Sequence, residues 1–415
     1  MTTGSSGIES SVGGPVGPRY KMHIRYSLPL LAFALIANAV PFFAYRPGDA
    51  DFYLIPWYQH ILAVGRIQVF AEPFSNYTPP YLYLLSGASI LNRWVEPLIA
   101  IKLLACIGAI WMAYAVARLL QSLGCRFAVE GAIASLLLPT VILNVSLLGQ
   151  ADTFWVAPCV LGLVAAIERR LGAVAFWSGV ALAFKLQAAF FAPFVLLLFL
   201  TRKAPWWCWL IPTIVYFAAM IPAWLVGWPA SNLLTVYVRQ ATWQPERIFV
   251  SNAASWWTIY GAFFPRLAVK TFWIGYVTAA AAVVEYIRRL HKSDLSPRAL
   301  AAAAALSAAG LPFLLPGMHE RFTILADVLT YCLAFSERSR CTIAAAALMQ
   351  IASAVTGYGW AFQKGLLELP ACFFALGAIM LLIEFLANPA ETADERPHVT
   401  HDPSGRSHGA ANPEA

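Results

Sequence analysis

The stretch Tyr45–Leu85 reads YRPGDADFYLIPWYQHILAVGRIQVFAEPFSNYTPPYLYLL and follows the first long apolar run of the chain. It contains two acids two residues apart, Asp49 and Asp51, then an aromatic segment that ends in Tyr-Thr-Pro-Pro-Tyr at positions 77–81. A Gly-Asp turn directly after a membrane helix places a carboxylate at the boundary between water and lipid. A base there can meet both a water-soluble group and the head of a lipid, so we expect this stretch to form the floor of an active site.

The composition indicates a membrane protein. Of 415 residues, 60% are hydrophobic and 12% are charged, whereas about a quarter of the residues of a soluble domain are charged. The net charge of +7 fits basic cytoplasmic loops better than a nucleic-acid surface. No two of the seven cysteines have the spacing of a zinc or redox motif, so we expect neither a disulfide nor a metal scaffold. The sequence therefore predicts an all-α polytopic membrane protein that binds no nucleic acid.

Apolar runs of the ~20 residues that a membrane helix needs recur along the chain. The run at 172–200 is interrupted by Lys185 and Gln187 and is basic at both ends, which indicates two short helices with these polar residues at their far tip. Together the runs predict about twelve membrane helices, near residues 25–45, 97–117, 127–148, 151–168, 172–200 (two), 205–226, 267–287, 297–316, 321–336, 341–361 and 366–387.

The positive residues give an orientation. Basic pairs near 118/126, 169/170, 202/203, 288–298 and 338/340 all fall on the side of the N-terminus, which the positive-inside rule places in the cytoplasm. Residues 46–96 then form one long extracytoplasmic loop with two helices along the membrane surface, at about 52–64 and 79–91. A Pro-Pro pair suits the start of the second helix.

We expect four regions. Residues 1–23 form a disordered cytoplasmic tail, and residues 24–226 a catalytic membrane module. Residues 227–387 form an extracytoplasmic loop, with 227–266 as a partly helical lid, followed by a C-terminal helix bundle. Residues 388–415 are polar and proline-rich and are expected to be a second disordered cytoplasmic tail.

Several polar residues fall on the extracytoplasmic side of this topology. A charge in hydrocarbon costs about 2.5–3.5 kcal/mol, so such residues usually face a cavity or a partner. Asp49 or Asp51 is either a loop acid that ends a helix or a general base for an acceptor hydroxyl. Asp152, after Gly149-Gln150, is either a helix N-cap or a group that positions an acceptor. Lys185 is either a snorkelling lysine or a cation that holds a phosphate.

A second basic group follows Pro316-Gly317. His319, Glu320 and Arg321 are expected to open a helix there, and a helix N-terminus with basic side chains favours an anion. The sequence contains no GxGxxG, Walker A or HExxH pattern, so we expect no nucleotide cofactor. We also expect no required metal ion, because two basic side chains can take its place beside a phosphate.

Five motifs in order resemble the GT-C superfamily of integral-membrane glycosyltransferases, and most closely the bacterial branch related to the mannosyltransferases of GPI-anchor synthesis. The motifs are Asp49 after the first helix, Tyr-Thr-Pro-Pro-Tyr, Gly149-Gln150-x-Asp152, Lys185-x-Gln187 and Met318-His319-Glu320-Arg321. The resemblance covers roughly residues 25–330. It implies a GT-C-like fold with a long first extracytoplasmic loop that carries two juxtamembrane helices.

The resemblance also implies a reaction. Such enzymes take a sugar from a polyprenyl-phosphate carrier, usually invert its anomeric centre, and use an acid of the first loop. Asp49 matches that acid best, and Asp51 is the reserve candidate. Gln150 and Asp152 match the second acidic motif. The remaining matches, expected near the donor phosphate, are Lys185, Gln187, His319, Glu320 and Arg321. One departure is Phe322, where the family pattern has Tyr, which bears on sugar contacts.

The implied partners are a polyprenyl-phosphate-linked sugar, a glycan or glycolipid acceptor, and membrane lipids. The nearest relatives favour mannose, although glucose, galactose and arabinose are equally compatible with the residues. The expected location is a bacterial inner membrane, with the site facing the periplasm or exterior. The alternative is a transporter or lipid-linked-sugar flippase whose charged residues line a pathway, but transporters often repeat a broken helix in both halves and no second break is evident here.

Overall fold

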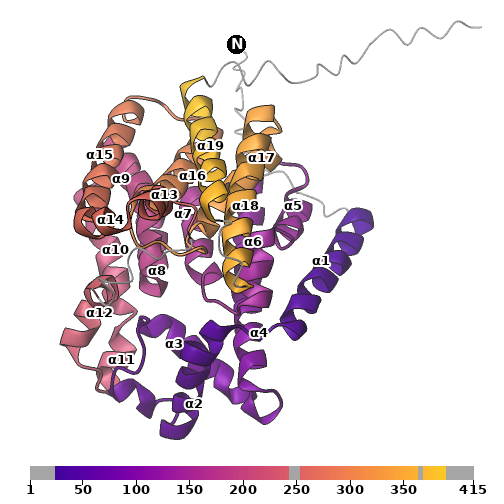
Figure 1. The fold of residues 1–415 in the computed structure, drawn as a ribbon, viewed down its shortest axis with the longest axis vertical. Coiled ribbons are helices and arrows are strands. Elements are labelled where there is room, and N and C mark those ends of the chain that lie inside the picture. The colour runs from indigo at the N-terminus through magenta and orange to yellow at the C-terminus, as the bar shows by residue number, and fades with distance from the viewer. Residues whose placement is uncertain (1–23, 243–252, 363–367, 389–415) are drawn as a thin grey trace, which may run out of the picture.

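The computed structural model describes residues 24–242, 253–362 and 368–388. Every regular element in these ranges is helical (Figure 1). The predicted N-terminal tail, all but Asn388 of the predicted C-terminal tail, and the middle of the predicted lid lie outside the described residues. The expectation of an all-helical chain is thus met wherever the structure describes it.

The helices follow one another with short connections. The first half of the chain contains α1 (Ile24–Ala44), the π-helical η1 (Ala50–Leu54), α2 (Ile55–Val64), η2 (Gln68–Ala71), α3 (Pro79–Ala88), η3 (Ser89–Arg93), α4 (Pro97–Ser122), α5 (Ala128–Ser135), α6 (Pro139–Ile142), η4 (Leu143–Leu147), α7 (Thr153–Ile167), α8 (Leu171–Phe184), η5 (Leu186–Phe191) and α9 (Ala192–Thr201). The second half contains α10 (Trp206–Ala218), α11 (Ile221–Val226), α12 (Ala230–Thr242), α13 (Trp256–Phe263), α14 (Pro265–Thr271), α15 (Trp273–Leu290), α16 (Pro297–Leu314), α17 (Ile324–Glu337), α18 (Arg340–Ala361) and α19 (Glu368–Ala387).

Each apolar run of the sequence coincides with helix, but the helices differ in length. Within the described ranges, six helical segments are long and apolar enough to cross a membrane, and up to eight if each of two bent pairs is one span. The bends are 51° between Ala128–Ser135 and Pro139–Leu147 and 63° between Pro265–Thr271 and Trp273–Leu290. Three further apolar helices, Thr153–Ile167, Leu171–Phe184 and Leu186–Thr201, are shorter. The count of twelve membrane helices therefore stays a prediction.

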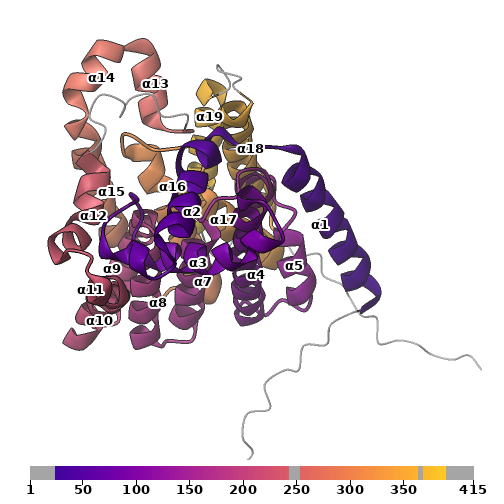
Figure 2. The ribbon, with the colours of Figure 1, turned by 90° about the horizontal axis from the view of Figure 1, so that it is seen from below.

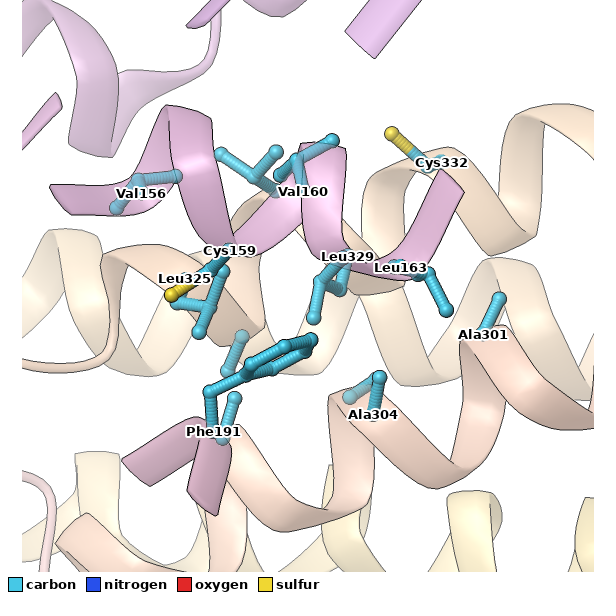
Figure 3. Packing of buried hydrophobic residues seen from close by; sticks show 14 of the residues in the cluster. Val156, Cys159, Val160, Leu163, Phe191, Ala301, Ala304, Leu325, Leu329 and Cys332 are labelled. Carbon is cyan, nitrogen blue, oxygen red and sulfur yellow. The ribbon is translucent and has the colours of Figure 1, made fainter. Parts of the chain in front are cut away.

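The core forms around α7, which is buried along its whole length. Val160 and Leu163 of α7 pack with Phe191 of η5, Ala304 of α16 and Leu329 of α17 (Figure 3). The helix α4 also packs closely against α7. A Cβ added at Gly108 of α4 would come within 2.4 Å of a side-chain atom of Thr153 in α7. Small residues on α4 and α16 thus let the neighbouring backbones approach α7, as is common between membrane helices.

The first loop forms a helical layer at one end of the bundle, where α2 and α3 lie together in both views (Figures 1 and 2). The predicted helices at 52–64 and 79–91 correspond to η1 with α2 and to α3 with η3. Pro79 and Pro80 open α3, as expected for a proline pair at a helix N-terminus. That these helices follow a membrane surface stays a prediction.

The run at 172–200 is broken where the sequence predicted. The helix α8 ends at Phe184, Lys185 has an extended backbone (φ −155°, ψ 144°), and η5 and α9 follow. Lys185 therefore lies at the tip of a helical hairpin. Its side chain is buried.

Charged residues gather at both ends of α7. Asp152 immediately precedes the helix and Glu168 follows it, so that about 22 Å of helix separates them at 1.5 Å per residue. Two basic residues that the sequence assigned to the cytoplasmic side, Arg118 (3.7 Å) and Arg170, pair with Glu168. Of the other residues assigned to that side, Arg169 lies 3.7 Å from Asp294, and Arg298 pairs with Glu337 at 2.6 Å. The polar motifs and the basic flanks thus occupy separate ends of the bundle.

Candidate functional site

The side chain of Asp152 is completely buried, with 0% of its surface exposed. Its Oδ1 accepts a hydrogen bond from Nζ of Lys185 and one from Nε1 of Trp155 at 3.1 Å, and its Oδ2 accepts one from Nδ2 of Asn144 at 2.9 Å. Asp152 occupies the N-cap position of α7, but its side chain makes no capping hydrogen bond. The N-cap interpretation of the carboxylate is therefore wrong, because Lys185 and two neutral donors occupy its oxygens.

Arg321 joins the acids of three separate segments. Its Nη1 donates to Oδ2 of Asp49 and to Oε1 of Glu320, both at 3.0 Å, and its Nε lies 3.7 Å from Oδ2 of Asp152. The Arg321 side chain is 14% exposed and that of Asp49 is 20% exposed. Residues separated by up to 272 positions in the sequence thus share one cluster, which we call the acid–base cluster: Asp49, Asp152, Lys185, Glu320 and Arg321.

Two adjacent residues of the first loop, Tyr77 and Thr78, hold the Lys185 hairpin in place. The hydroxyl of Thr78 donates to the carbonyl oxygens of Ala183 (2.7 Å) and Phe184 (3.0 Å), the last two residues of α8. The neighbouring ring of Tyr77 lies 5.1 Å from Nζ of Lys185 and faces it as a cation–π partner. The Tyr-Thr-Pro-Pro-Tyr motif therefore positions the cation as well as opening α3.

Lys102 of α4 fixes the segment before Asp49. Its side chain is fully buried, and its Nζ donates to the carbonyl oxygens of Phe42 and Tyr45 at 2.7 Å each and of Pro41 at 3.4 Å. These are carbonyls at the end of α1, where a cation is favourable. On the other side of the same lysine, a Cβ at Gly149 (φ +65°) would lie 3.1 Å from its Cγ. Lys102 thus packs between the two turns that carry Asp49 and Gln150.

The structure separates the two acids of the first loop. Asp51 is 43% exposed and pairs with Arg46 through bonds of 2.7 and 2.9 Å, whereas Asp49 faces Arg321. Residues two positions apart in a helical turn point to opposite sides of it, which explains why the two carboxylates face different partners. Asp49 therefore belongs to the acid–base cluster and Asp51 does not.

The glutamines of the motifs also differ. Gln150 is buried, and its Nε2 lies 3.5 Å from Oδ2 of Asp49, at the long limit of a hydrogen bond. Gln187 lies within η5, and its buried Oε1 has no hydrogen-bond partner among the described residues. Among the described residues, the structure thus brings Gln150 to the cluster but shows no hydrogen bond between Gln187 and the cluster.

The structure corrects the expected helix start after Gly317. Residues 320–323 form a turn, and α17 begins at Ile324, so His319, Glu320 and Arg321 precede the helix rather than open it. Their position is set by side-chain pairing: the His319 ring packs on Phe322 at 5.1 Å, and Arg321 reaches back to Glu320. The amides of a helix N-terminus therefore do not form an anion site here, and the positive charge of this group comes from the Arg321 side chain.

The three polar side chains at 319–321 differ in their charge states. Burial raises the pKa of Glu320 above its ordinary value, although Arg321 opposes the shift. Displacement of water around His319, together with the charge of Arg321, lowers the pKa of the imidazole to about 4, while 52% of its side-chain surface stays exposed. At neutral pH His319 is thus an uncharged imidazole, and the cations of the cluster are Lys185 and Arg321.

No family model and no curated protein matches the sequence. The structure, however, is similar to the crystal structure of ArnT from Cupriavidus metallidurans bound to undecaprenyl phosphate, with a TM-score of 0.51 and 14% sequence identity. The similarity covers 90% of this chain and 78% of that one. This chain has a GT-C fold. The mannosyltransferase branch that the sequence suggested within this fold stays a prediction.

Three neighbours of the charged residues in this fold were not predicted from the sequence. Asn144 and Trp155 bind Asp152, and Tyr77 lies over Lys185. Asn144 is a polar residue inside the apolar run 127–148, and this position was a sequence signal for a buried polar partner. Nothing in the sequence distinguished Trp155 from the many other tryptophans.

The residues that the structure describes contain no group of three or more His, Cys, Asp or Glu side chains arranged to hold a metal ion. The three acids of the acid–base cluster surround Arg321 instead, with its Nη1 between Asp49 and Glu320. That the reaction needs no metal stays a prediction, tested below.

Proposed function

We propose that this protein is a glycosyltransferase that moves a hexose from a polyprenyl-phosphate carrier to an extracytoplasmic glycan or lipid acceptor. The carrying observation is the contact of Arg321 with Asp49, at 3.0 Å, on one side and with the Asp152–Lys185 pair on the other. A carboxylate suited to take a proton thus lies beside two cations suited to hold a phosphate. The GT-C fold, shared with a protein crystallised with undecaprenyl phosphate, supports a lipid-phosphate donor.

The proposed reaction is a direct displacement. Asp49 takes the proton of an acceptor hydroxyl as that oxygen attacks the anomeric carbon of the sugar. The bond between that carbon and the phosphate oxygen breaks, and its electron pair stays on the leaving phosphate. Because attack and departure occur on opposite faces of the ring, the anomeric centre is inverted.

Lys185 and Arg321 have the role of stabilising the charge on the leaving phosphate. Preorganised cations in a site shielded from water stabilise developing charge more strongly than they would in water. Lys185 has three N–H donors, of which Asp152 accepts one, so donors remain for a phosphate. Asp152, which is buried beneath Lys185, is therefore a positioning residue rather than a contact of the acceptor.

The finer assignments follow the resemblance. Mannose is the favoured hexose, and the site is proposed to face the periplasm or exterior of a bacterial inner membrane. The basic residues around Glu168, at the far end of α7 from Asp152, support this orientation under the positive-inside rule. Phe322, which replaces the tyrosine of the family pattern, makes an edge-to-face contact with the His319 ring and is the residue whose change bears on sugar choice.

The experiment compares Asp49→Asn with Asp51→Asn in purified protein. Each variant receives polyprenyl-phosphate mannose, glucose, galactose or arabinose with radiolabelled sugar, and membranes of a strain that lacks the protein as acceptor. We expect Asp49→Asn to lose transfer by about 10²–10⁴-fold, the usual contribution of a general base. Asp51→Asn retains transfer, because Asp51 pairs with Arg46 outside the cluster.

Full transfer by both variants contradicts the assignment of Asp49. Transport of an intact lipid-linked sugar across proteoliposomes without any transfer supports the flippase alternative instead. Mass spectrometry of cell-envelope glycans and lipid-linked sugars in the deletion strain identifies the transferred sugar from the mass that is lost.

A further inference from the structure

A cavity of about 580 Å³ lies between the first loop and α12. Tyr53, Trp57 and Phe74 give it aromatic walls, and Asn76, Arg239 and Gln240 give it polar ones. Its volume is in the range of about 300–1,000 Å³ that is usual for small-ligand sites. No step of the proposed reaction uses these residues.

The mixture of walls indicates the kind of ligand. A groove for an acyl chain would be lined by apolar groups alone, and a phosphate site would gather several cations. Here the lining combines three aromatic rings with two amides and one guanidinium, together with Pro73, Ser75 and Val236. Nη2 of Arg239 already donates to the carbonyl of Asn232 at 2.9 Å. A pyranose ring fits this lining, because its C–H face packs on aromatic rings while its hydroxyls bond with amides.

One amide of the cavity has spare hydrogen-bonding capacity. The side-chain oxygen of Asn76 is buried and has no hydrogen-bond partner in the part of the chain that the structure describes. The backbone carbonyl of the same residue accepts a hydrogen bond from Nε2 of Gln240, which ties α12 to the first loop. An unpaired buried acceptor is costly, and a ligand hydroxyl would satisfy it.

The position of the cavity relates it to Asp49. Asp49, Tyr53 and Trp57 follow one another at four-residue steps through η1 and the start of α2, and residues at this spacing share a helix face. The Tyr53 and Trp57 rings are 6.1 Å apart, and the Trp57 ring is 5.1 Å from that of Tyr77, which faces Lys185. A sugar in the cavity therefore lies along the helix that carries the base and two rings away from the phosphate-binding cation.

We propose that this cavity binds a pyranose unit of the acceptor, and that Tyr53 and Trp57 place that unit so that a hydroxyl reaches Asp49. That the bound ligand is the acceptor rests on the proposed function, whereas that it is a pyranose rests on the lining of the cavity alone. It makes Tyr53, which is 38% exposed, a specificity-determining residue.

The test is saturation-transfer NMR on the full-length protein in lauryldimethylamine oxide, a detergent without a sugar head. The probes are methyl α-mannoside, methyl β-glucoside and methyl β-galactoside. At least one should bind the wild-type protein, and its affinity should fall fivefold or more in Tyr53→Ala. The matched control is Phe52→Ala, because Phe52 is the adjacent residue of η1, is 79% exposed and does not line the cavity.

Absence of binding for all three probes overturns the proposal, as does equal binding by Tyr53→Ala and the wild type. Displacement of the bound pyranoside by undecaprenyl phosphate also overturns it, because the cavity would then belong to the donor. Transfer from a polyprenyl-phosphate sugar without pyranoside binding rejects the cavity and leaves the proposed function standing. Pyranoside binding without any transfer overturns the acceptor assignment together with the proposed function.

Discussion

Nη1 of Arg321 lies 3.0 Å from Oδ2 of Asp49, and its Nε lies 3.7 Å from Oδ2 of Asp152. One guanidinium thus connects the acid of the first loop with the acid that holds Lys185. Only a planar group with several fixed donors can contact both at once. The geometry of the cluster therefore depends on arginine and not on positive charge alone.

Arg321→Lys tests this dependence. We expect transfer to fall by about 10²–10³-fold, the range for loss of one preorganised donor, because an ammonium cannot reach Asp49, Glu320 and Asp152 together. The measurement is the transfer rate at saturating donor. Arg46→Lys is the matched control, since Arg46 pairs with the exposed Asp51 and the exchange there should leave the rate unchanged. A full rate in Arg321→Lys would show that charge alone suffices.

The Asp152–Lys185 pair is expected to behave as a unit. Both side chains are buried, and removal of one partner from a buried ion pair costs about 3–5 kcal/mol, because the other charge stays unpaired. Asp152→Asn and Lys185→Met should each lower the free energy of unfolding, measured by denaturation in mixed micelles. The double variant should lose less than the sum of the two. Additive losses would mean that the two side chains do not interact in the folded protein.

Thr78→Val tests the attachment of the first loop to the Lys185 hairpin. The substitution leaves the carbonyls of Ala183 and Phe184 without the hydroxyl that binds them, at a cost of about 1–3 kcal/mol. We expect lower stability and a higher KM for the donor, because Lys185 is the next residue. Thr235→Val is the control, since that exposed hydroxyl bonds only with Ser231 within α12. An unchanged donor KM would separate Thr78 from the site.

The lowered pKa of His319 predicts a pH dependence of stability. Below pH 6.5 the unfolded state takes up a proton on this residue while the folded state does not, so stability falls as the pH drops from 6.5 toward about 4. His319→Gln should remove this part of the slope in Tm measured across that range. We expect a shallow effect, because the imidazole is half exposed. An identical slope in the variant would place the titration elsewhere.

Removal of metal ions should not affect transfer. Lys185 and Arg321 supply the positive charge that a divalent ion would otherwise bring to a leaving phosphate. Activity is measured before and after dialysis against EDTA, and then with added Mg²⁺ or Mn²⁺. A loss that either ion restores would contradict the prediction.

The sequence predicted the parts of the site that depend on the path of the chain. The break at Lys185, the two first-loop helices and the meeting of Asp49, Asp152 and Arg321 follow from where apolar runs end. Which oxygen meets which donor did not follow. Asp49 and Asp51 could not be separated without the turn of η1, and the bond of Trp155 with Asp152 depends on the rotation of α7.

The helix start at Ile324 was missed for a different reason. Pro316-Gly317 is a sound local signal for the end of one element, but residues 320–323 form a turn, within which Arg321 pairs with Asp49, 272 positions away. Contacts between distant segments thus overrode a local preference. The same applies to Asp152, whose oxygens bind Lys185 in place of the backbone of α7.

Lys102 has a consequence for how the protein is made. The carbonyls that end α1 are bound by a lysine of α4, so the segment that carries Asp49 acquires its final position only after α4 has left the ribosome. Until then the end of the first helix has no contact with Lys102 of α4. Biogenesis of this protein therefore completes the acid–base cluster late, although Asp49 belongs to a part of the chain that is synthesised early.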